Sequence, residues 1–85
     1  MANLYTSQLM EVSSNPVEIL IDRVDISAQV RLEVSKFSAN EEPLGVIIPP
    51  TTYVENCVEN KTRIRVFLDE GQVAAGEKIQ VKLDN

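Results

Sequence analysis

Two arginines and a phenylalanine alternate along one short segment, and they are the residues best suited to bind a partner. A strand over this segment would place Arg63, Arg65 and Phe67 on one face. Arginine and aromatic side chains are the usual anchors of protein interfaces, and a strand that carries both could also bind single-stranded nucleic acid. A third interpretation is a solvated outer face on which the arginines pair with acids such as Glu55 or Glu59.

The overall charge favours a protein partner over nucleic acid. The 85-residue chain has 13 acidic and 8 basic residues, a net charge of -5 and an isoelectric point near 4.6. Binding to a phosphate backbone requires a basic surface, which this composition does not provide. We therefore expect a protein partner and no nucleic acid, with a basic partner surface and salt-sensitive association.

The residue types that perform catalysis are scarce. The chain has no histidine, which is the commonest general base near neutral pH and the commonest metal ligand. The single cysteine, Cys57, excludes an internal disulfide and a cysteine-rich zinc site, and its neighbours Glu55 and Glu59 disfavour a thiolate. Three scattered glycines form no phosphate-binding loop. We expect no enzyme, no cofactor and no metal.

Pairs of acidic residues are the remaining candidates for chemistry. They are Asp22 and Asp25, Glu41 and Glu42, and Asp69 and Glu70. Paired carboxylates can carry acid–base chemistry or bind calcium, but these pairs lack the run of oxygen ligands of a known calcium loop. We interpret them as solvated loop or strand-edge residues, with a weak calcium site at Asp22–Asp25 or Asp69–Glu70 as the alternative.

The elements that would position these residues follow the two-residue period of β-strands. Four segments alternate apolar and mostly polar residues: Val17–Asp22, Val30–Ser35, Arg63–Leu68 and Lys78–Leu83. Three weaker segments fill the gaps: Leu4–Val12, Leu44–Ile48 and Thr52–Val58, the last of which has no clear inward face. The outward Lys78, Gln80 and Lys82 are interpreted as a guard on an exposed terminal strand.

Turn-forming residues separate these segments at the expected places. Ser13–Pro16 ends the first segment, Pro49–Pro50 forms a stiff corner where the chain could cross between sheets, and Asn60–Lys61 indicates a tight hairpin. The loop 69–77 could pack on the core or form a contact. The pattern predicts one all-β domain over residues 1–85, an antiparallel β-sandwich of about seven short strands, with a small β-barrel as the alternative.

The second half of the chain resembles immunoglobulin-like domains in the order of its elements. Val54–Leu83 reads as strand, tight turn, strand, glycine-containing loop and final alternating strand. The cysteine pair and the tryptophan of true immunoglobulin domains are absent from this sequence. The resemblance implies an immunoglobulin-like sandwich and assigns no functional residue.

The first segment could also serve assembly. Residues 1–12 are set apart by Ser13–Pro16 and could form an arm exchanged with a second chain, or could pair within their own domain. A homo-oligomer is therefore one expectation. The predicted interface residues are Tyr5, Leu9, Tyr53, Arg63, Arg65 and Phe67.

These observations favour a non-catalytic structural or assembly protein that acts through protein–protein contacts. The preferred example is a small virion component, such as a phage capsid decoration (cement) subunit or a tail protein bound to a capsid or tail lattice. The alternative is a cytoplasmic adaptor or peptide-binding module that adds a strand to an exposed edge. Residues 1–22 contain no basic residue and no apolar run of the length that a signal peptide needs, and no segment reaches the length of a membrane span. We therefore expect a virion or cytoplasmic location and no membrane partner.

Overall fold

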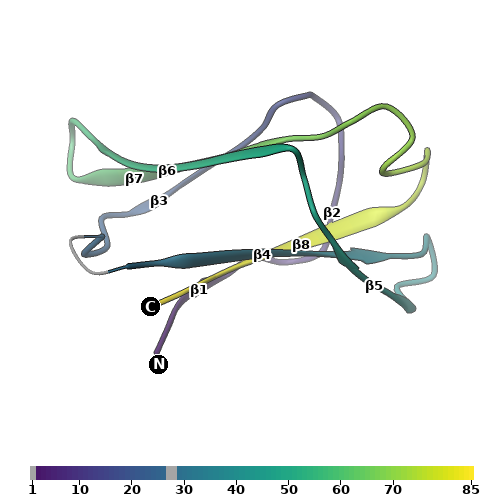
Figure 1. Cartoon of the computed structure of the whole chain (residues 1–85), viewed down its shortest axis with the longest axis horizontal. Coiled ribbons are helices and arrows are strands. Elements are labelled where there is room, and N and C mark those ends of the chain that lie inside the picture. Colours follow the sequence, from purple (N-terminus) through teal and green to yellow (C-terminus); the bar gives the residue numbers. More distant parts are fainter. Residues whose placement is uncertain (1, 27–28) are drawn as a thin grey trace.

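The strands of the protein lie in two layers, one above the other (Figure 1). The computed structural model describes residues 2–26 and 29–85, and this part of the chain contains no helix. Its strands are β1 (Asn3–Thr6), β2 (Met10–Glu11), β3 (Val17–Asp22), β4 (Arg31–Phe37), β5 (Pro43–Ile47), β6 (Thr51–Cys57), β7 (Lys61–Phe67) and β8 (Lys78–Asp84). The predicted all-β fold is confirmed, and the described residues form one strand more than about seven because the expected first strand is divided into β1 and β2.

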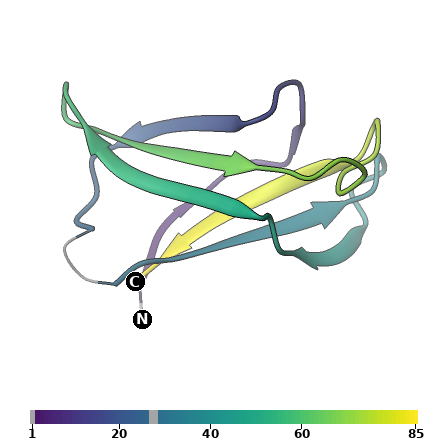
Figure 2. The ribbon, with the colours of Figure 1, turned by 45° about the horizontal axis from the view of Figure 1, so that its top comes forward.

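Each layer is a separate antiparallel sheet. One sheet has the order β1-β8-β4-β5, with β2 also paired to β8, and the other has the order β3-β7-β6. No pairing between described residues joins the two sheets, so the protein is the predicted sandwich and not the barrel alternative. Pro49 and Pro50 lie where the chain leaves β5 and crosses to β6 in the other sheet (Figure 2).

The core lies between the inward faces of β7 and β8. Every second residue of β8 is fully buried: Ile79, Val81 and Leu83. The same holds for Thr62, Ile64 and Val66 of β7. Thr62 is the polar member, and its Oγ1 accepts the backbone N–H of Val24 at 3.0 Å and donates to Asn56 Oδ1 at 2.7 Å. These bonds satisfy the hydroxyl, whose burial would otherwise be costly.

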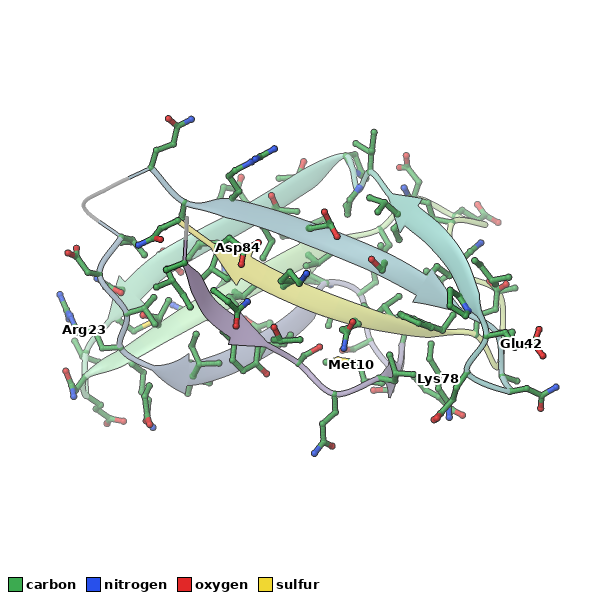
Figure 3. All side chains as sticks on the ribbon, turned by 90° about the horizontal axis from the view of Figure 1, so that it is seen from below. Met10, Arg23, Glu42, Lys78 and Asp84 are labelled. Atoms are coloured by element: carbon green, nitrogen blue, oxygen red, sulfur yellow. The ribbon has the colours of Figure 1, made fainter. Side chains whose placement is uncertain are left out.

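β8 is a central strand and not an exposed edge. It pairs with β4 on one side and with β1 and β2 on the other, as Figure 3 shows from below. The interpretation of its outward lysines as an edge guard is therefore wrong. Lys78 instead forms an ion pair with Glu41 at 3.0 Å, and Lys82 lies opposite Glu33 of β4.

The N-terminal segment pairs antiparallel with β8 of its own chain, and this pairing is interrupted at Ser7. The Ser7 N–H donates to Val81 O at 2.9 Å, while Ser7 Oγ accepts the Val81 N–H, also at 2.9 Å. The hydroxyl therefore takes the place of a backbone carbonyl where the ladder is interrupted between β1 and β2. Exchange of residues 1–12 with a second chain stays a prediction.

The strand order differs from that of immunoglobulin domains. In those domains the last two strands are neighbours in one sheet, whereas β7 and β8 belong to opposite sheets here. The likeness of Val54–Leu83 is therefore limited to the order of strands and turns along the chain.

The loop between β7 and β8 packs against one end of the sandwich. Val73 contacts the core cluster, and Gln72 Nε2 donates to Ile48 O at 2.7 Å. Glu77 accepts the N–H of Ala74 at 2.7 Å and lies 3.4 Å from Lys36 Nζ. The N–H of Ala74, and then the ammonium of Lys36, lower the pKa of the Glu77 carboxyl.

Replacement of the buried Ser7 hydroxyl should destabilise the fold. We expect Ser7→Ala to lower the free energy of unfolding by about 1–3 kcal/mol, because the buried N–H of Val81 loses its acceptor. Urea unfolding followed by circular dichroism measures the change. The control is Ser35→Ala on the outward face of β4, and equal midpoints for the two variants would contradict the assigned role.

Candidate functional site

The outer face of the β3-β7-β6 sheet carries an ordered set of ion pairs, and we call it the three-stranded face. The central strand β7 presents three cations that alternate with its buried residues. The pairs are Lys61 Nζ with Asp22 Oδ1 at 2.8 Å, Arg63 Nη2 with Glu55 Oε1 at 3.1 Å, and Arg65 Nε with Glu18 Oε1 at 2.9 Å. The acid belongs to β3 in the first and third pairs and to β6 in the second.

The second neighbour of each cation is an uncharged residue. In the register of the sheet, Lys61 lies opposite Cys57, Arg63 opposite Leu20, and Arg65 opposite Tyr53. Leu20 and Tyr53 are 61% and 53% exposed. The rings of Tyr53 and Phe67 meet edge to face, with their centroids 5.8 Å apart, which is a favourable aromatic geometry. Two apolar groups are thus exposed between paired charges.

The ion pairs neutralise the three-stranded face without contributing much to stability. Exposed pairs of this kind are worth about 0–1 kcal/mol each. Their three positive and three negative side chains cancel, so the whole net charge of -5 resides on the rest of the molecule. The pairs also hold the guanidinium groups of Arg63 and Arg65, each about one-third exposed, in defined positions.

Lys61 also sets the ionisation of its partner acid. Its hydrogen bond to Asp22, and then its positive charge, lower the pKa of the Asp22 carboxyl below 3.8. Both effects favour the carboxylate over the neutral acid. The pair therefore stays charged at neutral pH and keeps this corner of the face neutral.

Four of the six predicted interface residues come together, and two do not. Tyr53, Arg63, Arg65 and Phe67 share the three-stranded face. The pairing of Arg63 with Glu55 matches the interpretation of an ion-paired outer face.

The remaining two residues lie in the N-terminal segment. Tyr5 lies opposite Leu83 of β8 and packs against the core, and Leu9 is half-buried between β1 and β2. They are separated from the other four because residues 3–11 pair with β8, in the opposite sheet.

A hollow beside β4 is a feature that sequence reasoning missed. β5 pairs with β4 only from Val34 to Phe37, so no described strand pairs with Leu32 and Glu33 on that side. The space measures about 490 Å³. Its lining is Arg31, Leu32, Glu33, Val46, Ile47, Ile48, Pro49, Thr52 and Asp84. The sequence feature that could have indicated this hollow is the run from Pro43 to Val54, which contains no charged residue.

The other candidates for chemistry are dispersed. Over residues 2–26 and 29–85, no three His, Cys, Asp or Glu side chains are grouped to hold a metal ion. Cys57 is half-buried, and its Sγ lies 3.9 Å from Glu55 O. No helix long and apolar enough to cross a membrane occurs in the described ranges.

Comparison of the chain with protein-family models, with curated proteins and with solved structures finds no match.

The ionisation of Asp22 provides a direct check on the ion-paired arrangement. We expect an NMR titration of the carboxyl carbon to give a pKa below 3.8, and Lys61→Met to raise it. A carboxyl pKa lowered by folding stabilises the protein above the unfolded-state pKa and stops doing so as the pH falls through the folded-state value. The destabilisation caused by Asp22→Asn should therefore be present at neutral pH and disappear in acid. An unchanged pKa in Lys61→Met would contradict the assignment.

Proposed function

We propose that the protein is a non-catalytic assembly protein and that its three-stranded face binds another protein. The observation that carries this proposal is the exposure of Leu20 and Tyr53 within a face whose six charges are paired with one another. Interface centres are enriched in tyrosine and arginine. Tyr53, Arg63 and Arg65 supply these residue types here, and the charged side chains of the face are already paired.

The ion pairs reduce the cost of covering the face. An isolated charge that loses water on binding must find a new partner, or it incurs a large desolvation penalty. Arg63 and Arg65 already have carboxylates within 3.1 Å. Because their geometry is set in advance, less side-chain entropy is lost on binding. A partner could therefore cover Tyr53 and Phe67 while leaving the pairs intact.

Among assembly proteins, the class we propose is a small virion component, such as a phage capsid decoration subunit or a tail protein. Its support is the combination of an all-β sandwich and the proposed contact face. A repeated lattice offers many equivalent sites, so a face of modest size on each copy would be sufficient there. The net charge of -5 would favour a basic lattice surface.

Removal of the aromatic pair should weaken partner binding and leave the fold intact. Immobilised wild-type protein, Tyr53→Ala/Phe67→Ala and the control Glu33→Ala/Lys82→Ala would be exposed to an extract of the source cells or particles. The control removes an opposed pair on the outer face of the other sheet. We expect wild type and control to retain the same protein, and the aromatic variant to bind it at least about tenfold more weakly, as truncated interface anchors do.

Circular dichroism must show an unchanged sheet signal for both variants. Equal retention of the partner by the aromatic variant and the control would refute the three-stranded face as the contact surface.

The hollow beside β4 favours a second candidate, a peptide-binding module. The backbone of Leu32 and Glu33 borders the hollow, and no described strand pairs with it on that side, while Ile47, Ile48 and Pro49 supply apolar walls. An extended peptide could add a short strand to this open stretch and place one apolar side chain in the hollow.

Two adjacent residues of β6 can distinguish binding at the hollow from binding at the three-stranded face. Thr52 lines the hollow, whereas Tyr53 lies on the opposite face of the strand. Extended peptides would be selected from a random library against the wild-type protein. If the hollow is the site, Thr52→Trp should fill it and abolish binding of the selected peptides, while Tyr53→Ala should leave binding unchanged. The reverse result, measured by fluorescence polarisation, would exclude the hollow.

A further inference from the structure

We propose that the hollow beside β4 takes an extended protein segment in which an apolar residue directly adjoins a lysine or arginine. The inference rests on the second candidate function, because it names the kind of peptide that this hollow would bind. It does not involve the three-stranded face, which belongs to the other sheet. The two requirements on the segment come from the backbone of Leu32 and from the charged residues that line the hollow.

The backbone of Leu32 is oriented to pair with an added strand. The N–H and C=O of Val81 in β8 bond to Ser7, so they point away from β4. Val34 lies opposite Val81, and its backbone groups therefore point away from β8, toward β5. Backbone direction alternates along a strand, so the N–H and C=O of Leu32 point to the same side as those of Val34. β5 pairs with Val34 and not with Leu32, and in Figure 2 the first part of β4 lies at the margin of its sheet.

The inward side of this site requires an apolar side chain. Leu32 lies opposite the buried Leu83, so its own side chain points between the two sheets. A residue of an added strand that is opposed to Leu32 would point the same way, because opposed side chains share a face. It would enter the hollow, whose lining there includes Ile47, Pro49 and Thr52. Removal of its apolar surface from water would favour binding.

The loop between β7 and β8 holds the wall of the hollow in place. Gln72 Nε2 donates to Ile48 O at 2.7 Å, and Gln72 Oε1 accepts the N–H of Asp69 at 2.9 Å. Both ends of this side-chain amide are therefore bonded. Because the carbonyl of Ile48 is already occupied, an added strand would pair with β4 and not with the segment that follows β5. A wall that is fixed before binding also lowers the entropy cost of binding.

The charges around the hollow favour a basic residue next to the apolar one. The lining contains two carboxylates, those of Glu33 and Asp84, and one guanidinium, that of Arg31. Arg31 and Asp84 lie opposite each other across β4 and β8. Glu33 lies opposite Lys82, yet it takes part in none of the ion pairs between described residues. A carboxylate without an ion pair is thus available beside the position of the apolar residue.

The side chain of Glu33 lies on the outward face of β4, because it directly follows the inward Leu32. In an added strand, one chain neighbour of the apolar residue would lie opposite Glu33 on that face. Opposite charges at opposed positions stabilise strand pairing, whereas like charges destabilise it. The net charge of -5 on the whole chain also favours a basic partner. Lysine or arginine is therefore expected at this neighbouring position.

The test compares three blocked peptides at low salt: Thr-Lys-Val-Lys-Thr, Thr-Glu-Val-Glu-Thr and Thr-Lys-Ser-Lys-Thr. A lysine on each side of the valine places one opposite Glu33 whichever way the strand runs. We expect the lysine–valine peptide to shift the NMR signal of the Leu32 amide and to slow the exchange of its N–H with solvent. It should bind at least about fivefold more tightly than the glutamate peptide, because attraction to Glu33 replaces repulsion. The serine peptide should bind more weakly, because it leaves the hollow unfilled.

Glu33→Gln separates the effect of charge from that of shape. We expect it to weaken binding of the lysine–valine peptide by about two- to fivefold. The matched control is Glu59→Gln, which removes the same charge from the exposed β6–β7 turn, outside the lining of the hollow, and it should bind as wild type. Because Glu33 lies in the other sheet, its removal leaves the three-stranded face unchanged.

Two kinds of failure can be told apart. Equal binding of the lysine and glutamate peptides, or equal binding by the two glutamine variants, with the Leu32 signal still shifted, would overturn the charge requirement and leave the hollow as a peptide site. No shift of the Leu32 amide with any peptide would overturn the hollow as a binding site, and this inference with it. Neither result would bear on binding at the three-stranded face.

Discussion

The fold depends on the contact between two strands that lie face to face across the core. β7 and β8 are central in opposite sheets, and each presents three fully buried residues to the other. Burial of apolar side chains of this size contributes about 1.5–3 kcal/mol each, and a chain of this length has few other residues to bury. The remaining strands lie beside these two, and their inward residues extend the same core. The position of every outward residue follows from this arrangement, because successive side chains of a strand point to opposite faces.

Two buried hydroxyls complete the core where the chain departs from regular pairing. Ser7 bridges the interruption between β1 and β2, and Thr62 holds the chain at Val24 as it leaves β3. Each hydroxyl accepts a backbone N–H in place of a backbone carbonyl, which the irregular segment does not supply. Among the described residues, no buried side-chain nitrogen or oxygen lacks a hydrogen-bond partner. Such satisfaction matters in a small domain, since one orphaned polar group would remove a large part of its stability.

The charge of the protein is distributed unequally over its surface. On the three-stranded face the cations of β7 are matched by acids from both flanking strands, which leaves Leu20 and Tyr53 exposed on a neutral surface. The edge at β5 is neutral for a different reason, because its sequence contains no charge at all. The acidic protein thus carries two regions without net charge, the ion-paired three-stranded face and the β5 edge.

The alternation of residue types by itself determined the all-β class, the inward faces of β3, β4, β7 and β8, and the grouping of Arg63, Arg65 and Phe67. These properties are local, because a two-residue period assigns faces within a single strand. Only the tertiary structure decided which strands are neighbours. That choice placed β8 at the centre of its sheet, moved Tyr5 and Leu9 away from the other predicted site residues, and brought Leu20 beside Arg63. Pairing partners are far apart in the chain, and many strand orders bury the same apolar faces, so the pattern along one strand does not distinguish them. The exposure of Val46 likewise follows from its place opposite Ser35, on the outward face of its sheet.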